Sequence, residues 1–67
     1  MDDMIPKPGS RWLHKNGMTY TVALVTNLAS TKPAQYPATV VYFSDNDVWW
    51  SRPLERWHGS MILLPAQ

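Results

Sequence analysis

The side chains of this sequence that could support catalysis or metal binding are few. His14 and His58 are the only imidazoles, and there is no cysteine. A catalytic zinc ion usually has three protein ligands, and neither histidine has a carboxylate at ligand spacing. We therefore predict that each imidazole is hydrogen-bonded within the fold or faces solvent, and that the chain holds no metal and no other cofactor.

Nucleophilic or acid–base catalysis has equally little support. Ser51 and Ser60 are close to His58 in the sequence, but neither serine lies in a G-x-S-x-G or similar nucleophile motif. Asp45 and Asp47 share a turn, which such residues commonly shape. We predict no catalytic residue and no enzymatic activity. One alternative is an active site that forms around the symmetry axis of an oligomer. It rests only on an analogy with other small barrels.

The tryptophans are better candidates, as binding residues. Trp49 and Trp50 are adjacent in a predicted strand, so their side chains point to opposite faces and only one can enter the core. The other would be covered by a loop of the same chain or would be presented to a partner. Tryptophan is enriched at interfaces because it carries a large apolar area and one hydrogen-bond donor.

A second hypothesis is binding of nucleic acid. Arg11, Lys15 and Arg56 could form a patch beside Trp12 and Trp57, and rings between cations suit single-stranded nucleic acid, whose bases stack on them. Arg52 could bond an acidic side chain, with Asp45 or Glu55 available, or the carbonyls of a turn; the alternative is a contact with phosphate. The full set of predicted binding residues is Trp49, Trp57, Trp12, Arg11, Arg52 and Arg56.

Composition narrows the class of protein. A chain of 67 residues forms one domain with a small core, and without cysteine that core must be supplemented by aromatic packing or by oligomerisation. The net charge of +1 argues against a strongly basic nucleic-acid binder. There is no apolar stretch of about 20 residues, and the N-terminus lacks the features of a signal peptide. We predict a cytoplasmic protein with no membrane association.

Short β-rich runs separated by turn residues predict the elements that position these side chains. Asn16-Gly17 lies between two such runs and predicts a hairpin in which both residues have a positive φ. Pro53 ends a strand and can begin a helical turn. We expect strands at 11–15, 18–26, 38–44, 48–52 and 60–64, a helical turn at 53–58, and a long loop at 27–37.

These elements predict an all-β fold, a small SH3-like barrel of five strands with one short helical turn; an OB-like barrel is the alternative. The domain spans 1–67, with 1–9 as an extended N-terminal arm. The predicted core consists of Tyr20, Val22, Leu24, Val41, Leu54 and one of Trp49 and Trp50.

Residues 7–61 resemble a family of small, uncharacterised bacterial and phage proteins that form a domain of unknown function. The matching residues are Pro8, Gly9, Trp12, His14, Gly17, Tyr20, Val22, Val40, Val41, Tyr42, Trp50, Arg52, Pro53, Leu54 and Trp57. The resemblance implies a small β-barrel and puts Trp50 at the usual aromatic position, hence in the interior. Trp49 is an added aromatic, and the loop from Asn27 to Tyr36 has no counterpart in the pattern.

Together these observations predict a non-enzymatic protein-interaction module, a phage or bacterial accessory protein of unknown specific role. The partner is another protein or a second copy of the chain, and the binding face is centred on an outward Trp49 near Trp57 or Trp12. Nucleic-acid binding is the alternative.

Overall fold

Five antiparallel strands and one short helix make up the fold, which a computed structural model describes for residues 4–65. The elements are β1 (Arg11–His14), β2 (Thr19–Thr26), β3 (Thr39–Ser44), β4 (Trp49–Pro53), α1 (Leu54–Trp57) and β5 (Met61–Leu63). The predicted strands and helical turn are confirmed, with every boundary within one residue.

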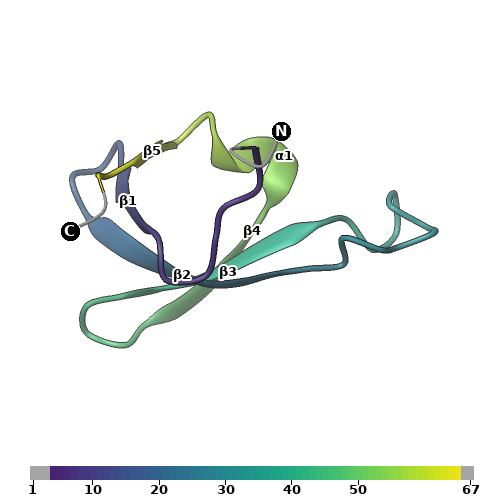
Figure 1. The fold of residues 1–67 in the computed structure, drawn as a ribbon, viewed down its shortest axis with the longest axis horizontal. Coiled ribbons are helices and arrows are strands. Elements are labelled where there is room, and N and C mark those ends of the chain that lie inside the picture. Colours follow the sequence, from purple (N-terminus) through teal and green to yellow (C-terminus); the bar gives the residue numbers. More distant parts are fainter. Residues whose placement is uncertain (1–3, 66–67) are drawn as a thin grey trace.

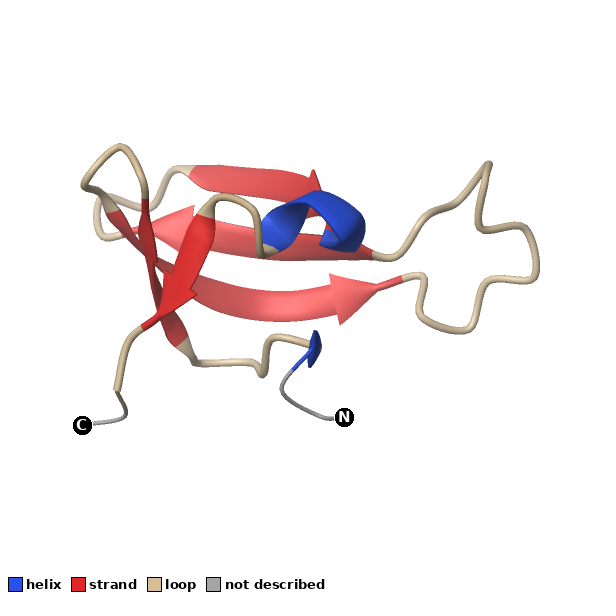
Figure 2. Ribbon diagram, turned by 90° about the horizontal axis from the view of Figure 1, so that it is seen from above, coloured by secondary structure: helices blue, strands red, loops and turns tan. Residues whose placement is uncertain are grey.

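The strands form one sheet in the order β4-β3-β2-β1-β5. β4 and β5 are its two edges, and within the described residues they are not paired with each other. β5 and α1 lie on the same side of β2, β3 and β4 (Figure 1). The loop 27–38 projects beyond the ends of β2 and β3 (Figure 2). The sheet therefore curls around one face without closing.

Buried side chains from the inner face of this sheet form the core. It consists of Trp12, Tyr20, Val22, Val40, Tyr42, Trp57 and Met61. The prediction is confirmed for Tyr20 and Val22, and Leu54 is half-buried against the same cluster. Strand alternation explains most of the set, because residues two apart on a strand face the same side.

Two residues predicted for the core lie elsewhere. Leu24 is 47% exposed, because the register shifts between Val22 and Leu24 and a β-bulge there turns Val25 inward instead. Val41 is only half-buried, because its neighbours Val40 and Tyr42 point inward. Both faces of β3 are apolar, so its sequence does not reveal which face is inside.

Edge-to-face aromatic contacts run through the core. The ring centroid of Trp57 lies 5.4 Å from that of Trp12 and 5.0 Å from that of Tyr42, and Tyr42 is 5.2 Å from Tyr20. The interplanar angles of these pairs lie between 73° and 90°, which brings the positive edge of one ring onto the negative face of the next. Trp57 joins α1 to β1 and β3 in this way.

Two hairpin turns share one geometry. In the β1–β2 turn, Gly17 N–H donates to His14 O and His14 N–H donates to Met18 O; Ser44, Asp47 and Val48 repeat the pattern in the β3–β4 turn. Each is a three-residue loop whose last residue has a positive φ, 92° at Gly17 and 63° at Asp47. The predicted turn with a positive φ at both Asn16 and Gly17 is therefore wrong, since only Gly17 has one.

Gly17→Ala is expected to lower the free energy of unfolding by about 1–2 kcal/mol, because an L side chain is disfavoured at a positive φ. No atom lies within 4 Å of the added Cβ, so the loss would report the backbone alone. Urea denaturation measures it. Gly59→Ala is the control: its φ is not positive and its Cβ would lie 3.8 Å from Arg56 O. An equal loss in both variants would contradict the turn assignment.

Trp57→Leu is expected to lower the free energy of unfolding by about 2–4 kcal/mol, because the indole is fully buried and contacts two other rings. The same change at Trp50, which is 51% exposed, should cost less than about 0.5 kcal/mol. Urea denaturation compares the two. Similar losses would show that Trp57 does not hold the core together.

Candidate functional site

β4 is the edge strand whose two faces carry the candidate binding residues. Trp50 pairs with Tyr42 and Arg52 pairs with Val40, so these two side chains lie on the inner face with the core. Trp49 pairs with Phe43, which puts it on the outer face. The two adjacent tryptophans thus serve opposite sides of the sheet, as the alternation predicts.

The prediction that Trp50 is buried is wrong, although its direction is inward. The side chain is 51% exposed. β4 has a neighbour on one side only, and within the described residues β5 does not pair with its free edge. An inward side chain on that edge therefore faces an opening.

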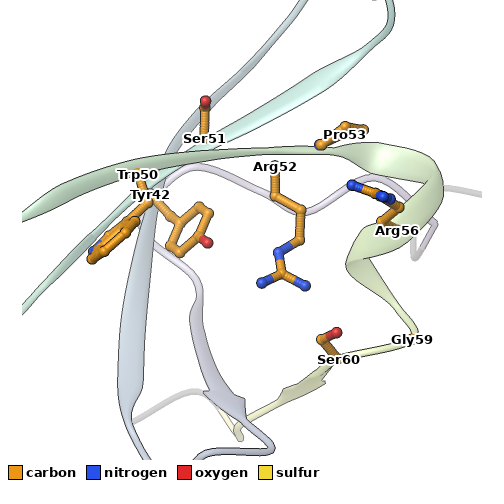
Figure 3. A pocket seen from close by; sticks show the side chains of 8 residues that line it. All are labelled: Tyr42, Trp50, Ser51, Arg52, Pro53, Arg56, Gly59 and Ser60. Atoms are coloured by element: carbon orange, nitrogen blue, oxygen red, sulfur yellow. The ribbon is translucent and has the colours of Figure 1, made fainter.

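The opening is a cleft of about 530 Å³ between β4, α1 and the start of β5. Its lining includes Tyr42, Trp50, Arg52, Arg56 and Ser60. Figure 3 shows the guanidinium of Arg52 extending from β4 into this space, with the Tyr42 ring on one side and Ser60 across from it. Aromatic, cationic and hydroxyl groups therefore converge on one solvent-accessible hollow.

The guanidinium of Arg52 has no acceptor that satisfies it among the described residues. Its Nη2 lies 3.4 Å from Nε2 of His14. The other ring nitrogen of His14, Nδ1, accepts a 3.0 Å hydrogen bond from Asn16 N–H. A neutral imidazole that accepts at Nδ1 carries its proton on Nε2. In this tautomer, Arg52 Nη2 and His14 Nε2 are both donors.

The cleft has cations without counterions. Within residues 4–65, no carboxylate lies within ion-pair distance of Arg52 or Arg56. The predicted pairing of Arg52 with Asp45 or Glu55 is therefore wrong, and Asp45 pairs with Arg11 instead. Two cationic side chains that line one cleft without a counterion favour the approach of an anion.

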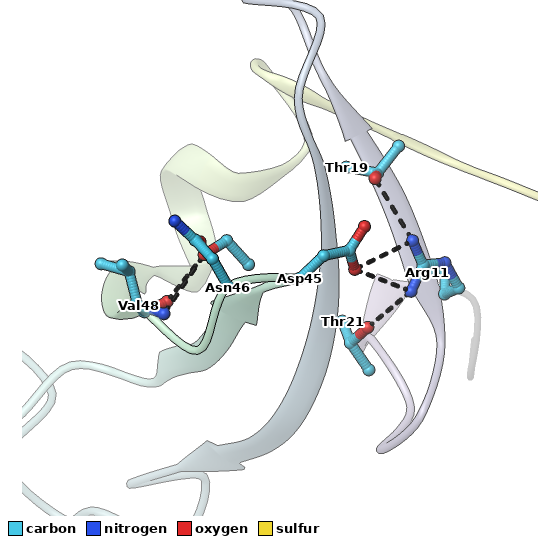
Figure 4. Close-up of polar contacts among 7 residues, drawn as sticks. Arg11, Thr19, Thr21, Asp45, Asn46 and Val48 are labelled. Carbon is cyan, nitrogen blue, oxygen red and sulfur yellow. Dashed lines mark hydrogen bonds and ion pairs between the residues drawn. The ribbon is translucent and has the colours of Figure 1, made fainter.

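Arg11 is held on the outer face by its neighbours. Its guanidinium donates to the hydroxyls of Thr19 and Thr21 at 3.2 and 3.1 Å, and it lies 3.3 Å from Asp45 Oδ1 (Figure 4). The pair is exposed, so it stabilises the fold by at most about 1 kcal/mol. Because its guanidinium is already bonded to Thr19, Thr21 and Asp45, Arg11 is not a free cation for a ligand.

The predicted patch of cations beside Trp12 and Trp57 does not form. Trp12 is 4% exposed and Trp57 is 0% exposed, so neither offers a ring face to a base. Arg11 is on the outer face, whereas Arg56 lines the cleft. The small domain needs both indoles for its core, which is why they are unavailable at the surface.

An apolar patch occupies the outer face of β2, β3 and β4, and we name it the outer patch. It consists of Leu24, Val41, Phe43 and Trp49, which lie in two adjacent rows of the sheet. The Trp49 ring stacks on Phe43 with centroids 4.8 Å apart and is still 58% exposed. The prediction of an outward Trp49 is confirmed, but its ring partner is Phe43 and not Trp57 or Trp12.

The remaining chemical groups form no further site in residues 4–65. His58 donates from Nε2 to Met4 O at 2.8 Å, which ties the N-terminal segment to the turn after α1. No group of three or more His, Cys, Asp or Glu side chains converges there. Neither Ser51 nor Ser60 is hydrogen-bonded to an imidazole in this part of the chain. A second hollow of about 610 Å³, between α1 and the loop 27–38, is mainly apolar.

Within the described residues, no helix is long and apolar enough to cross a membrane.

Sequence reasoning missed the cleft because it treated Trp50 and Arg52 separately. Their spacing of two residues on one strand is the signal that puts both on one face. The other lining residues Tyr42 and Ser60 come from β3 and from the segment before β5, and only the fold brings them close to β4.

Comparison of the chain with protein-family models, with curated proteins and with solved structures finds no match. The functional argument therefore rests on the geometry of the two faces of β4.

The ring of His14 is expected to carry its proton on Nε2 when it is neutral, because Nδ1 accepts from Asn16 N–H. Long-range ¹H–¹⁵N correlation spectra of the neutral ring identify the protonated nitrogen. His58 is an internal reference, since its Nε2 faces a carbonyl, which can only accept. A proton on Nδ1 of His14 would mean that Arg52 donates to His14 and is not free.

Proposed function

We propose that this chain is a non-enzymatic protein-interaction module built on an SH3-like barrel. The strand order β4-β3-β2-β1-β5, with a short helix between β4 and β5, supports that architecture over an OB-like one. The role of a phage or bacterial accessory protein and the cytoplasmic location remain predictions, the first of them from the family resemblance.

The observation that carries the proposal is the outer patch. Its member on the edge strand β4, Trp49, is a large aromatic side chain that stacks on Phe43 and is still 58% exposed. Polar groups surround it: the hydroxyls of Thr21 and Ser51 and the Arg11–Asp45 pair. An apolar centre with a polar rim is the usual anatomy of a protein interface.

We infer that the partner on this face is a second copy of the chain. The charges beside the outer patch, Arg11 and Asp45, are paired with each other, so they leave no net charge to select a partner of opposite charge. An apolar patch of this kind is complementary to itself, and two-fold dimers are the commonest assemblies. A dimer would also add buried apolar area that a domain of 67 residues lacks.

The test is sedimentation equilibrium on the parent and on Trp49→Ala. We expect a dimeric parent, and a dissociation constant at least tenfold higher for the variant, because a tryptophan at the centre of an interface typically contributes about 2 kcal/mol or more.

Tyr36→Ala is the matched control. Tyr36 is an exposed aromatic in the loop 27–38, away from the outer patch, so its removal should leave the dimer unchanged. A monomeric parent, together with a Trp49→Ala variant that loses several kcal/mol of stability, would show that Trp49 serves only to pack against Phe43.

A further inference from the structure

We propose that the cleft on the inner side of β4 binds a nucleotide unit, with the base against Trp50 and the phosphate held by Arg52 and Arg56. This site is separate from the outer patch, since Trp50 and Arg52 point to the face opposite Trp49. It also differs from the patch predicted from the sequence, whose tryptophans are buried.

The guanidinium of Arg52, which lines the cleft, favours a tetrahedral or planar oxyanion. Arg52 Nη2 and His14 Nε2 are 3.4 Å apart, and both carry hydrogens when Asn16 N–H occupies Nδ1 of His14. A phosphate oxygen in the cleft would give the Arg52 guanidinium an acceptor that His14 in this tautomer does not supply.

Charge points to the same ligand. Arg52 and Arg56 line one cleft, and within residues 4–65 neither guanidinium has an ion-pair partner. Glu55, the carboxylate next to Arg56 in the chain, lines the other hollow and not this one. Guanidinium groups match phosphate well because their planar array of donors bonds two oxygens at once.

Trp50 determines which phosphate-bearing molecule fits. Its indole is 51% exposed at the cleft, and within the described residues it does not stack on another aromatic ring. Bases stack on such rings beside cationic groups in proteins that bind single strands. The cleft volume of about 530 Å³ is within the usual range for a small-molecule site, which is room for one base and its phosphate.

An acidic peptide would also bring oxyanions, but it would leave the ring of Trp50 without a planar partner. The cleft has one exposed ring and two cations. A nucleotide matches both, because its base can stack on the ring and its phosphate can bind the cations. The unit could be a free nucleotide or part of a single strand, and the experiment distinguishes these sources.

The experiment is an NMR titration of the full chain at about 25 mM salt, following the Trp50 indole N–H and the Arg52 Nε–H signals. The probes are the octamer (dT)8, dTMP and a blocked tetraglutamate peptide. We expect (dT)8 or dTMP to shift both signals with saturation, and the peptide to bind at least tenfold more weakly. Tighter binding of (dT)8 than of dTMP identifies a single strand as the source, and equal affinity identifies the free nucleotide.

Two variants test the assigned roles. Trp50→Leu should weaken nucleotide binding about tenfold, because base–aromatic stacking is lost. Arg52→Gln should weaken it and reduce the slope of log affinity against log salt by about 0.7, the value for one phosphate contact on a single strand. The matched controls are Tyr36→Leu, an exposed aromatic, and Lys32→Gln, an exposed cation; both lie in the loop 27–38 and should leave affinity and slope unchanged.

Three results would overturn the proposal: no saturable shift with either nucleotide probe, equal affinity for the tetraglutamate peptide, or binding that Trp50→Leu leaves intact in a folded variant. Trp50 is outside the core, so its replacement should not unfold the domain. None of these results bears on self-association through Trp49, which sedimentation tests independently.

Discussion

The contact on which the rest of the structure depends is the packing of Trp57 between Trp12 and Tyr42. The indole is fully buried and meets both rings edge to face. It connects α1 to β1 and β3, and the chain has no cysteine that could do so with a disulfide. The cost is one buried donor, because the Trp57 indole N–H has no partner among the described residues.

The same contact explains why the sheet stays open. α1 follows β4 directly, and its last residue, Trp57, is in the core, so the chain turns away from the β4 edge before β5 begins. β5 then pairs with β1 and not with β4. The gap leaves two inward side chains of β4, Trp50 and Arg52, at the edge of the core, where water and a ligand can reach them.

The sequence predicts the strands, turns and helix well, and the burial of individual side chains less well. Strand and turn boundaries follow from local chemistry, such as Pro53 at the end of β4. Burial depends on non-local facts: the bulge after Val22 that turns Leu24 outward, and the unpaired edge that exposes Trp50. The site was harder still, because Arg52 meets His14 across 38 positions of sequence, a contact that only the curl of the sheet creates.

The two adjacent tryptophans, Trp49 and Trp50, can both be exposed because the core of this small domain makes little use of β4. A strand has two faces, and in most small domains one of them is used entirely for the core. Here the core is supplied by β1, β2, β3, α1 and β5, so β4 contributes little to it and both of its faces are available. One face carries an aromatic among apolar neighbours and the other an aromatic among cations. Because the strand itself separates them, a protein on the outer patch would not block the cleft, and the two faces can be occupied at the same time.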